Sequence, residues 1–128
     1  LTKKLRKMKT TKEIAKEIKE YFKPMAKTNN LLLSIRTEYN HISVNVMRFN
    51  EPILKEYENE HFKRINQWCI NDSEKLTVAG KTIFNMIMQI INKYHYDRSD
   101  SMTDYFDTNF YIHLEVGRFD KDFELKTC

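Results

Sequence analysis

The chain has 128 residues, a formal net charge of +4, and only two glycines and two prolines. Average usage would give about nine Gly and six Pro at this length, so collagen-like, glycine-linker and proline-rich architectures are excluded. No apolar run approaches the roughly 20 residues of a membrane span, and the first residues lack the apolar stretch of a secretory signal. We therefore expect a cytoplasmic protein without a membrane partner.

Charge is unevenly distributed along the chain. Residues 1–27, the basic head, hold ten Lys and Arg against three Glu, a net charge of +7. Residues 97–124, the acidic tail, hold three basic against eight acidic groups, a net charge of −5. The head is typical of a solvated lysine face or of phosphate contact, and the tail suits a basic partner.

The two cysteines indicate a reducing, intracellular compartment. Cys69, which we expect in a helix, and Cys128 form neither a CxxC pair nor a disulfide framework. The four histidines show no metal-ligand spacing with one another or with either cysteine, so we expect no zinc site. No other sequence feature requires a cofactor.

Residues 1–9 are expected to form a disordered basic arm. Thr10 and Glu13 carry the signature of a capping box, in which each side chain accepts a hydrogen bond from the backbone of the other. Apolar residues then recur at helical spacing, which predicts a first helix over 11–23. Pro24 should end this helix, because it cannot continue the hydrogen-bond ladder.

A β-hairpin is predicted after this helix, with strands over 31–39 and 41–49 and Asn40 between them. In the second strand, apolar residues alternate with Ser43, Asn45 and Met47. One face of that strand is therefore apolar.

A second helix is predicted over 51–70, with Asn50 as its cap and Pro52 in its first turn. Its expected buried stripe is Leu54, Tyr57, His61, Ile65 and Trp68.

A third helix is predicted over 78–94, capped by Thr77 or Ser73. Its expected core stripe is Ile83, Ile87, Ile90 and Tyr94, and the residues that widen this stripe are Phe84, Met88 and Ile91. So little polar surface remains that the helix is either central to the core or presents an apolar ridge to a partner. A homodimer through this helix is one candidate assembly.

The remaining residues complete an α+β fold. Residues 95–108 are the longest irregular stretch, a strand is predicted over 110–116, Gly117 breaks it, and 118–125 can add a short edge strand. The order α-β-β-α-α-β predicts a single domain over 10–128, with a small antiparallel sheet packed on helices along one face.

Familiar phosphate-binding motifs are incomplete in this chain. Gly80-Lys81-Thr82 matches the end of a Walker A loop, but the second glycine that the motif requires is replaced by Lys75. We therefore expect these residues to form an ordinary first turn of a helix. The helix and strand order resembles that of type II KH domains, yet Gly80 also lacks the partner glycine of their GxxG loop.

The most distinctive segment is rich in aspartate and aromatic residues. Its carboxylates can cap turns, bind a hard cation, or meet Arg and Lys on a partner. Half of the 16 aromatic residues lie within residues 94–123, which favours a protein interface. The candidate partner-binding residues are Asp97, Asp100, Asp104, Tyr105, Phe106 and Asp107.

An alternative binding surface is basic. The lysines of the first helix and two arginines of the hairpin could contact nucleic acid phosphates. These residues are Lys12, Lys16, Lys19, Lys23, Arg36 and Arg48.

Two stretches carry a resemblance to a known family. One joins KEIAKEIKEYF to LLLSIRTEYNHISVNV within residues 12–46, and the other is NKYHYDRSDSMTDYFDTNFYIHLEVGRFDKDFEL over residues 92–125. Together they resemble phage- and plasmid-borne domains of the large polyvalent protein-associated type, over about half the chain. The Lys-rich head and the Met/Ile-rich third helix depart from that pattern. The resemblance implies a mobile-element protein and brings no catalytic residue.

We therefore expect a non-enzymatic interaction protein of a phage or mobile element, acting in the host bacterial cytoplasm by stoichiometric binding. The expected partner is a host protein or ribonucleoprotein such as a CRISPR effector, which would make the chain a counter-defence or anti-CRISPR inhibitor. The alternatives are a nucleic-acid-binding accessory protein, a metal-dependent enzyme that uses the aspartates, and a structural subunit.

Overall fold

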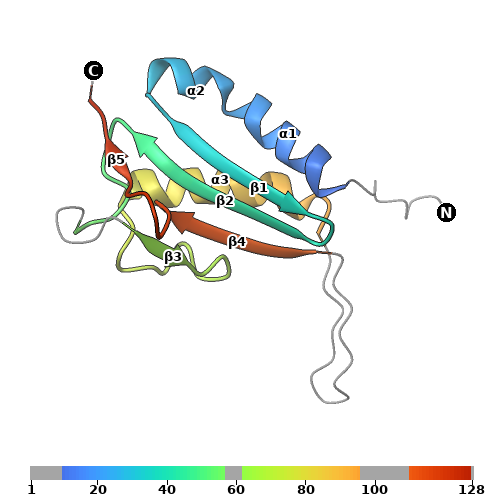
Figure 1. Ribbon diagram of the computed structural model, residues 1–128. Helices are drawn as coiled ribbons and strands as arrows, with labels where there is room; N and C mark the ends of the chain where they lie inside the picture. The colour runs from blue at the N-terminus through green and yellow to red at the C-terminus, as the bar shows by residue number, and fades with distance from the viewer. Residues whose placement is uncertain (1–9, 57–61, 96–109, 128) are drawn as a thin grey trace, which may run out of the picture.

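A computed structural model describes residues 10–56, 62–95 and 110–127. The helices are α1 (Thr11–Tyr21), α2 (Lys23–Thr28) and α3 (Val78–Asn92). The strands are β1 (Leu32–Glu38), β2 (His41–Phe49), β3 (Lys63–Ile65), β4 (Tyr111–Val116) and β5 (Glu124–Leu125). Helices α1 and α3 lie against the same face of the sheet (Figure 1). The predicted α+β class is confirmed.

The sheet is mixed, so the prediction of an antiparallel sheet is wrong for its central pair. Its strand order is β1-β2-β4-β3, and β5 pairs with the end of β2. The β1–β2 and β3–β4 pairs are antiparallel, whereas β2 runs parallel to both β4 and β5. Alternation of apolar residues sets which face of a strand is buried, but it does not distinguish parallel from antiparallel neighbours.

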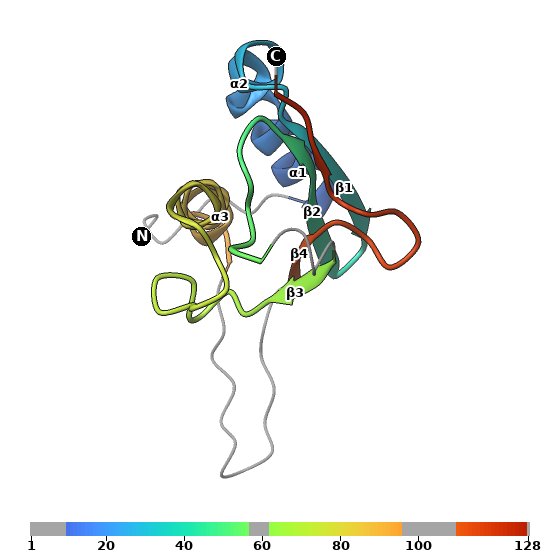
Figure 2. The same cartoon turned by 90° about the vertical axis from the view of Figure 1, so that its left-hand side faces the viewer.

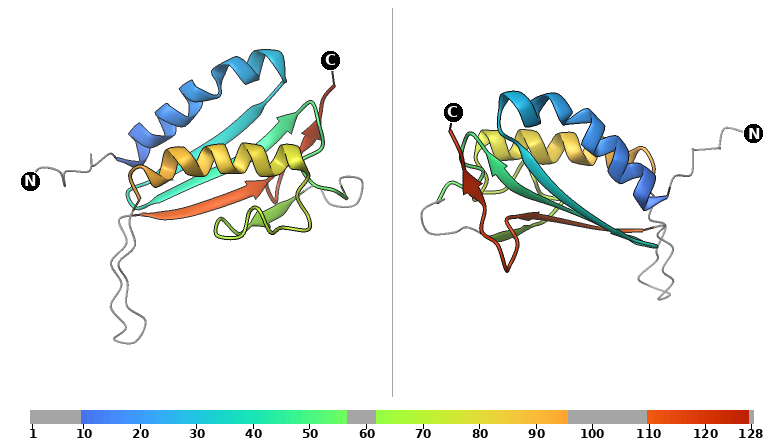
Figure 3. Two further views of the ribbon diagram at one scale, coloured as in Figure 1. Left: turned by 180° about the vertical axis from the view of Figure 1, so that it is seen from behind. Right: turned by 45° about the horizontal axis from the view of Figure 1, so that its top comes forward.

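The core lies between the sheet and the two long helices (Figure 3). Ile42, Val44 and Val46 of β2 are fully buried, as the alternation predicted. Helix α3 buries seven residues: Gly80, Ile83, Phe84, Ile87, Met88, Ile90 and Ile91. The apolar stripe that suggested a dimer surface is therefore occupied by the core of this chain.

Helix α1 begins as predicted and ends differently. The capping box is present, with Glu13 N–H donating to Thr10 Oγ1 at 3.1 Å and Thr10 N–H donating to Glu13 Oε1 at 3.0 Å. The chain turns at Phe22 and continues as α2, so Pro24 does not end the first helix. Pro24 instead occupies the first turn of α2, where its missing N–H has no helical partner in any case.

The predicted hairpin is confirmed, and its second strand contains a bulge. Leu32 pairs with Arg48 while Leu33 pairs with Val46, so Met47 is the additional residue on β2. A bulge shifts the alternation of side chains, and Phe49 rather than Arg48 accordingly enters the core.

The predicted helix over 51–70 is wrong in the described part of that range. Residues 53–55 pair with 75–77 instead, through the Leu54–Leu76 bridge and a hydrogen bond from Lys55 N–H to Lys75 O. Of the proposed stripe, Leu54 and Ile65 are buried, but Trp68 is 65% exposed. Tyr57 and His61 lie outside the described residues. Cys69 is exposed in a loop and not helical.

Helix α3 is confirmed, with Thr77 rather than Ser73 as its cap. Thr77 Oγ1 accepts a hydrogen bond from Gly80 N–H at 3.0 Å and donates to Pro52 O at 2.7 Å. Gly80 lies against the backbone of the 53–55 segment, which fixes the start of the helix. The Gly80-Lys81-Thr82 motif is a helical first turn, as expected.

The last described strands differ from the sequence prediction in length. β4 begins one residue after Phe110, which is buried. Gly117 ends it with a φ of 71°, a backbone conformation that glycine adopts without a steric penalty. The predicted edge strand over 118–125 is reduced to the two residues of β5.

A side chain at Gly80 should destabilise the fold. A Cβ atom there would lie 2.7 Å from Ile53 O and 3.0 Å from Ile53 Cγ2. Gly80→Ala is expected to lower the free energy of unfolding by about 1–3 kcal/mol, although alanine favours helices. Chemical denaturation measures this, with the exposed Thr82→Ala in the same helix as control. Equal stability of the two variants would contradict the close approach.

Candidate binding surface on the open face of the sheet

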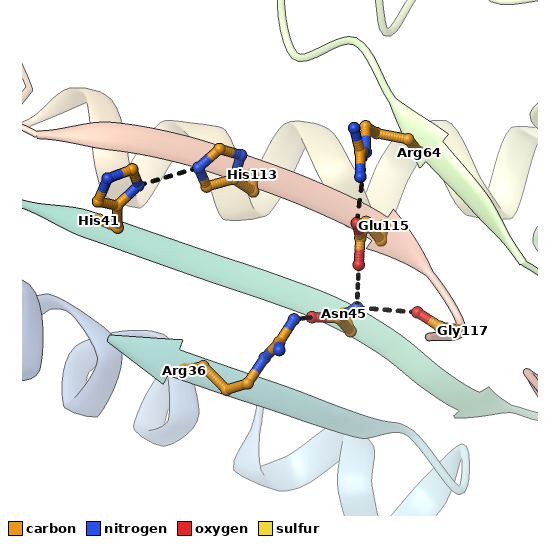
Figure 4. A network of polar contacts seen from close by, with 7 residues as sticks. All are labelled: Arg36, His41, Asn45, Arg64, His113, Glu115 and Gly117. Carbon is orange, nitrogen blue, oxygen red and sulfur yellow. Dashed lines mark hydrogen bonds and ion pairs between the residues drawn. The ribbon is translucent and has the colours of Figure 1, made fainter. Parts of the chain in front are cut away.

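One face of the sheet is not covered by any described helix (Figure 2). We call it the open face. Its side chains alternate with the buried residues of β2 and β4. They belong to Arg36, His41, Ser43, Asn45, Arg64, Tyr111, His113 and Glu115. Figure 4 shows six of them on the side of the sheet that faces away from the helices.

Asn45 is the centre of a polar network on this face (Figure 4). The parallel register places it beside Glu115, and its amide donates to Glu115 Oε1 at 2.6 Å and to Gly117 O at 2.8 Å. Arg36 Nη2 donates to Asn45 Oδ1 at 3.5 Å. Asn45 is fully buried, and these bonds satisfy both of its amide hydrogens, so the amide is held in one orientation.

Glu115 is held from both sides. Its Oε1 atom accepts from Asn45, and its Oε2 atom lies 3.5 Å from Arg64 Nε. The Glu115 side chain is only 14% exposed, whereas that of Arg64 is 80% exposed. Glu115 therefore holds Arg64 at its Nε atom, and the remaining donors of that guanidinium group face solvent.

His41 and His113 meet on the same face. His41 Nδ1 and His113 Nε2 are 3.0 Å apart, the ring centroids are 5.2 Å apart, and the ring planes differ by 9°. Because the two nitrogen atoms are much closer than the ring centres, the rings meet edge to edge through one hydrogen bond. Burial lowers the pKa of His113, and the neighbouring His41 and Arg64 lower it further. The lowered pKa favours the neutral imidazole of His113.

A recess of about 400 Å³ opens beside this network. It is lined by Arg36, Phe62, Arg64, Glu115, Arg118, Phe119 and Asp120. Phe119 is 86% exposed, and Tyr111 is also exposed on this face. Arginine and aromatic side chains therefore surround a fixed polar centre.

The acidic and aromatic site predicted from the sequence is not tested by the structure. All six residues of that set, Asp97, Asp100, Asp104, Tyr105, Phe106 and Asp107, lie outside the described residues. Among the aromatic residues that are described between 94 and 123, Phe110 and Phe123 are buried, and only Tyr111 and Phe119 are largely exposed.

The six residues of the alternative basic surface do not form one surface. All four lysines of that set are exposed along α1 and α2, on the helical side of the sheet. Arg36 lies on the open face. Arg48 donates from Nε to Asn30 O at 3.1 Å and lies 4.0 Å from Glu124. The lysines therefore remain a candidate surface without the two arginines.

The open face was missed by sequence reasoning, although part of its signal is present. His41, Ser43 and Asn45 occupy every second position of one strand, and Tyr111, His113 and Glu115 do so in another. This spacing indicates two polar strand faces. It does not show that the two strands are neighbours, which is the fact that creates the network.

Other candidate sites carry less chemistry. Within residues 10–56, 62–95 and 110–127, no three His, Cys, Asp or Glu side chains are grouped to hold a metal ion. Over the same ranges, no helix is both long and apolar enough to cross a membrane. A shallow groove between α1 and α3 is bridged by Glu17, which forms an ion pair with Lys93 and accepts from Tyr94 Oη at 2.8 Å.

Comparisons with known proteins leave the family open. No protein-family model, no curated protein and no solved structure matches this chain. The resemblance to large polyvalent protein-associated domains stays a prediction from the sequence.

Replacing the central amide by a carboxylate should destabilise the open face. In Asn45→Asp a second carboxylate would face Glu115 where the hydrogen bond now measures 2.6 Å. We expect a loss of about 2–4 kcal/mol in the free energy of unfolding at pH 7. The double variant Asn45→Asp with Glu115→Gln should recover part of this loss, because the glutamine amide can donate.

Urea denaturation of the two single variants and the double variant measures this coupling. Purely additive losses would contradict a direct bond between the two side chains.

Proposed function

We propose that the chain is a non-enzymatic binding protein whose open face docks a partner protein in a stoichiometric complex. The observation that supports this most is the combination of exposed arginine and aromatic side chains with a rigid polar network on an uncovered sheet. Interface centres are enriched in aromatic residues and arginine, and binding is tighter when the contact groups are held in place before association.

The position of Glu115 favours binding over catalysis on this face. A general base needs a carboxylate oxygen that can accept a proton from a substrate. Both oxygen atoms of Glu115 are already engaged, one by Asn45 and the other by Arg64. The carboxylate is better suited to anchoring its neighbours than to exchanging protons.

The biological setting of the proposal comes from the sequence resemblance alone. On that basis we propose a phage or mobile-element protein that inhibits or modulates a host protein or nucleoprotein. A host defence complex such as a CRISPR effector is the candidate target that follows from it.

Site-specific photocrosslinking in a bacterial host tests the docking surface. A benzoylphenylalanine placed at Phe119 should give one discrete adduct with a host protein, in a one-to-one ratio by mass spectrometry. The same probe at Thr82, which is exposed on α3, is the control and should give none. Equal yields from both positions, or no adduct from Phe119 or Tyr111, would contradict the proposal.

A second function, nucleic-acid binding, is favoured by the arrangement of charge on α1. Lys12, Lys16 and Lys19 are spaced four and three residues apart in α1, so they share one side of that helix, and Lys23 begins α2. Glu17 lies on the other flank, where it bonds Lys93 and Tyr94 of the α3 end. The Glu17 carboxylate is thus turned toward α3.

Binding to a labelled DNA strand at increasing salt tests this alternative. Lys12→Glu with Lys16→Glu should abolish binding and flatten its salt dependence. The control variant, Lys121→Glu with Lys126→Glu, makes the same change in net charge outside α1. It should bind DNA more strongly than the first variant. Absence of binding by the unmodified chain at low salt would exclude the lysine flank as a nucleic-acid surface.

A further inference from the structure

The recess on the open face contains more positive than negative charge. Three guanidinium groups line it, those of Arg36, Arg64 and Arg118, against the carboxylates of Glu115 and Asp120. Glu115 is already engaged by Asn45 and Arg64. One positive charge therefore remains without a carboxylate partner among the lining residues.

Two of the arginines have donors to spare. Arg36 makes a single long contact, 3.5 Å to the amide oxygen of Asn45, and none of the described carboxylates forms an ion pair with it. Arg118 Nε forms an ion pair with Asp120 Oδ1 at 3.3 Å, and the Arg118 side chain is 31% exposed.

The walls of the recess suit a side chain with an apolar stem. Phe62 and Phe119 line it together with the arginines. Phe119 is 86% exposed, so a partner that covers its ring removes apolar surface from water. Arginine guanidinium groups bind carboxylates through two parallel hydrogen bonds.

We infer that this recess takes an aspartate or glutamate side chain of the partner protein, with Phe119 covered by the same contact. The inference rests on the proposed function, because it names the chemistry of the partner at that surface. A phosphate fits the guanidinium groups equally well. However, Glu115 and Asp120 line the same recess and would repel the repeated charges of a nucleic-acid backbone.

An NMR titration tests the inference without knowledge of the natural partner. The probe is the blocked peptide acetyl-Glu-Phe-Glu-Glu-amide, and the readout is the set of assigned arginine Nε–H signals. We expect saturable shifts at Arg36, Arg64 and Arg118 and none at Arg48. The peptide with glutamine in place of every glutamate should cause no shift.

Arg118→Gln should weaken peptide binding by about tenfold or more, because it removes a donor from a charged hydrogen bond. Lys121→Gln is the matched control: it removes the same charge from the same turn and should leave affinity within about twofold. Phe119→Ser should weaken binding while its exposed position leaves the fold, monitored by the remaining backbone signals, unchanged.

Three outcomes would overturn the inference. They are equal losses in Arg118→Gln and Lys121→Gln, equal binding of the glutamine peptide, and tighter binding of a short oligothymidylate at the same arginines. If the Phe119 probe gives a host adduct but any of these results is obtained, the proposed function stands. Only the inference that the recess takes an acidic side chain is then rejected. If the peptide binds specifically but no host adduct forms, the acidic-side-chain recess stands and the proposed function is rejected.

Discussion

β2 and β4 run parallel at the centre of the sheet, and a parallel pair cannot be joined by a tight turn. The chain between them must cross from one end of the sheet to the other, and α3 lies along that path. This pairing aligns Asn45 with Glu115 and places Gly117 just beyond the end of β4. An antiparallel arrangement would oppose different residues, and the amide would lose both of its acceptors. The polar network therefore depends on strand direction as much as on residue identity.

The same two strands build the core with one face and the candidate binding surface with the other. On the helical side, Val44 and Leu114 are fully buried beneath α3 and α1. Among the described residues of the open side, Asn45 alone is a fully buried polar side chain, and its hydrogen bonds compensate for its removal from water. Arg64 can project toward solvent because Glu115 holds its Nε atom. Stability and the proposed recognition thus depend on alternating residues of the same two strands.

Local patterns predicted the elements whose stability is local. Three features depend on residues that are close together in the sequence, and all three are confirmed. They are the capping box at Thr10, the hairpin at Asn40 and the apolar repeat of α3. The helix over 51–70 was wrong because the buried position of Leu54 arises from its pairing with Leu76, which no helical spacing reveals. For the same reason the polar faces of β2 and β4 were visible singly but not as neighbours. Non-local pairing decided both the main error and the missed site.

The two basic surfaces of this chain carry different cationic side chains, a difference that the net charge of +4 does not show. The α1 flank offers lysines, compact charges on flexible stems that suit the diffuse field of a phosphate backbone. The open face offers arginines, whose planar donors suit a carboxylate of fixed orientation, and these arginines sit among carboxylates that would disfavour a polyanion. Because the sheet separates the two surfaces, a partner on one does not obstruct the other (Figure 2). A protein partner on the open face and a nucleic acid on the lysine flank are therefore compatible, as binding to a nucleoprotein would require.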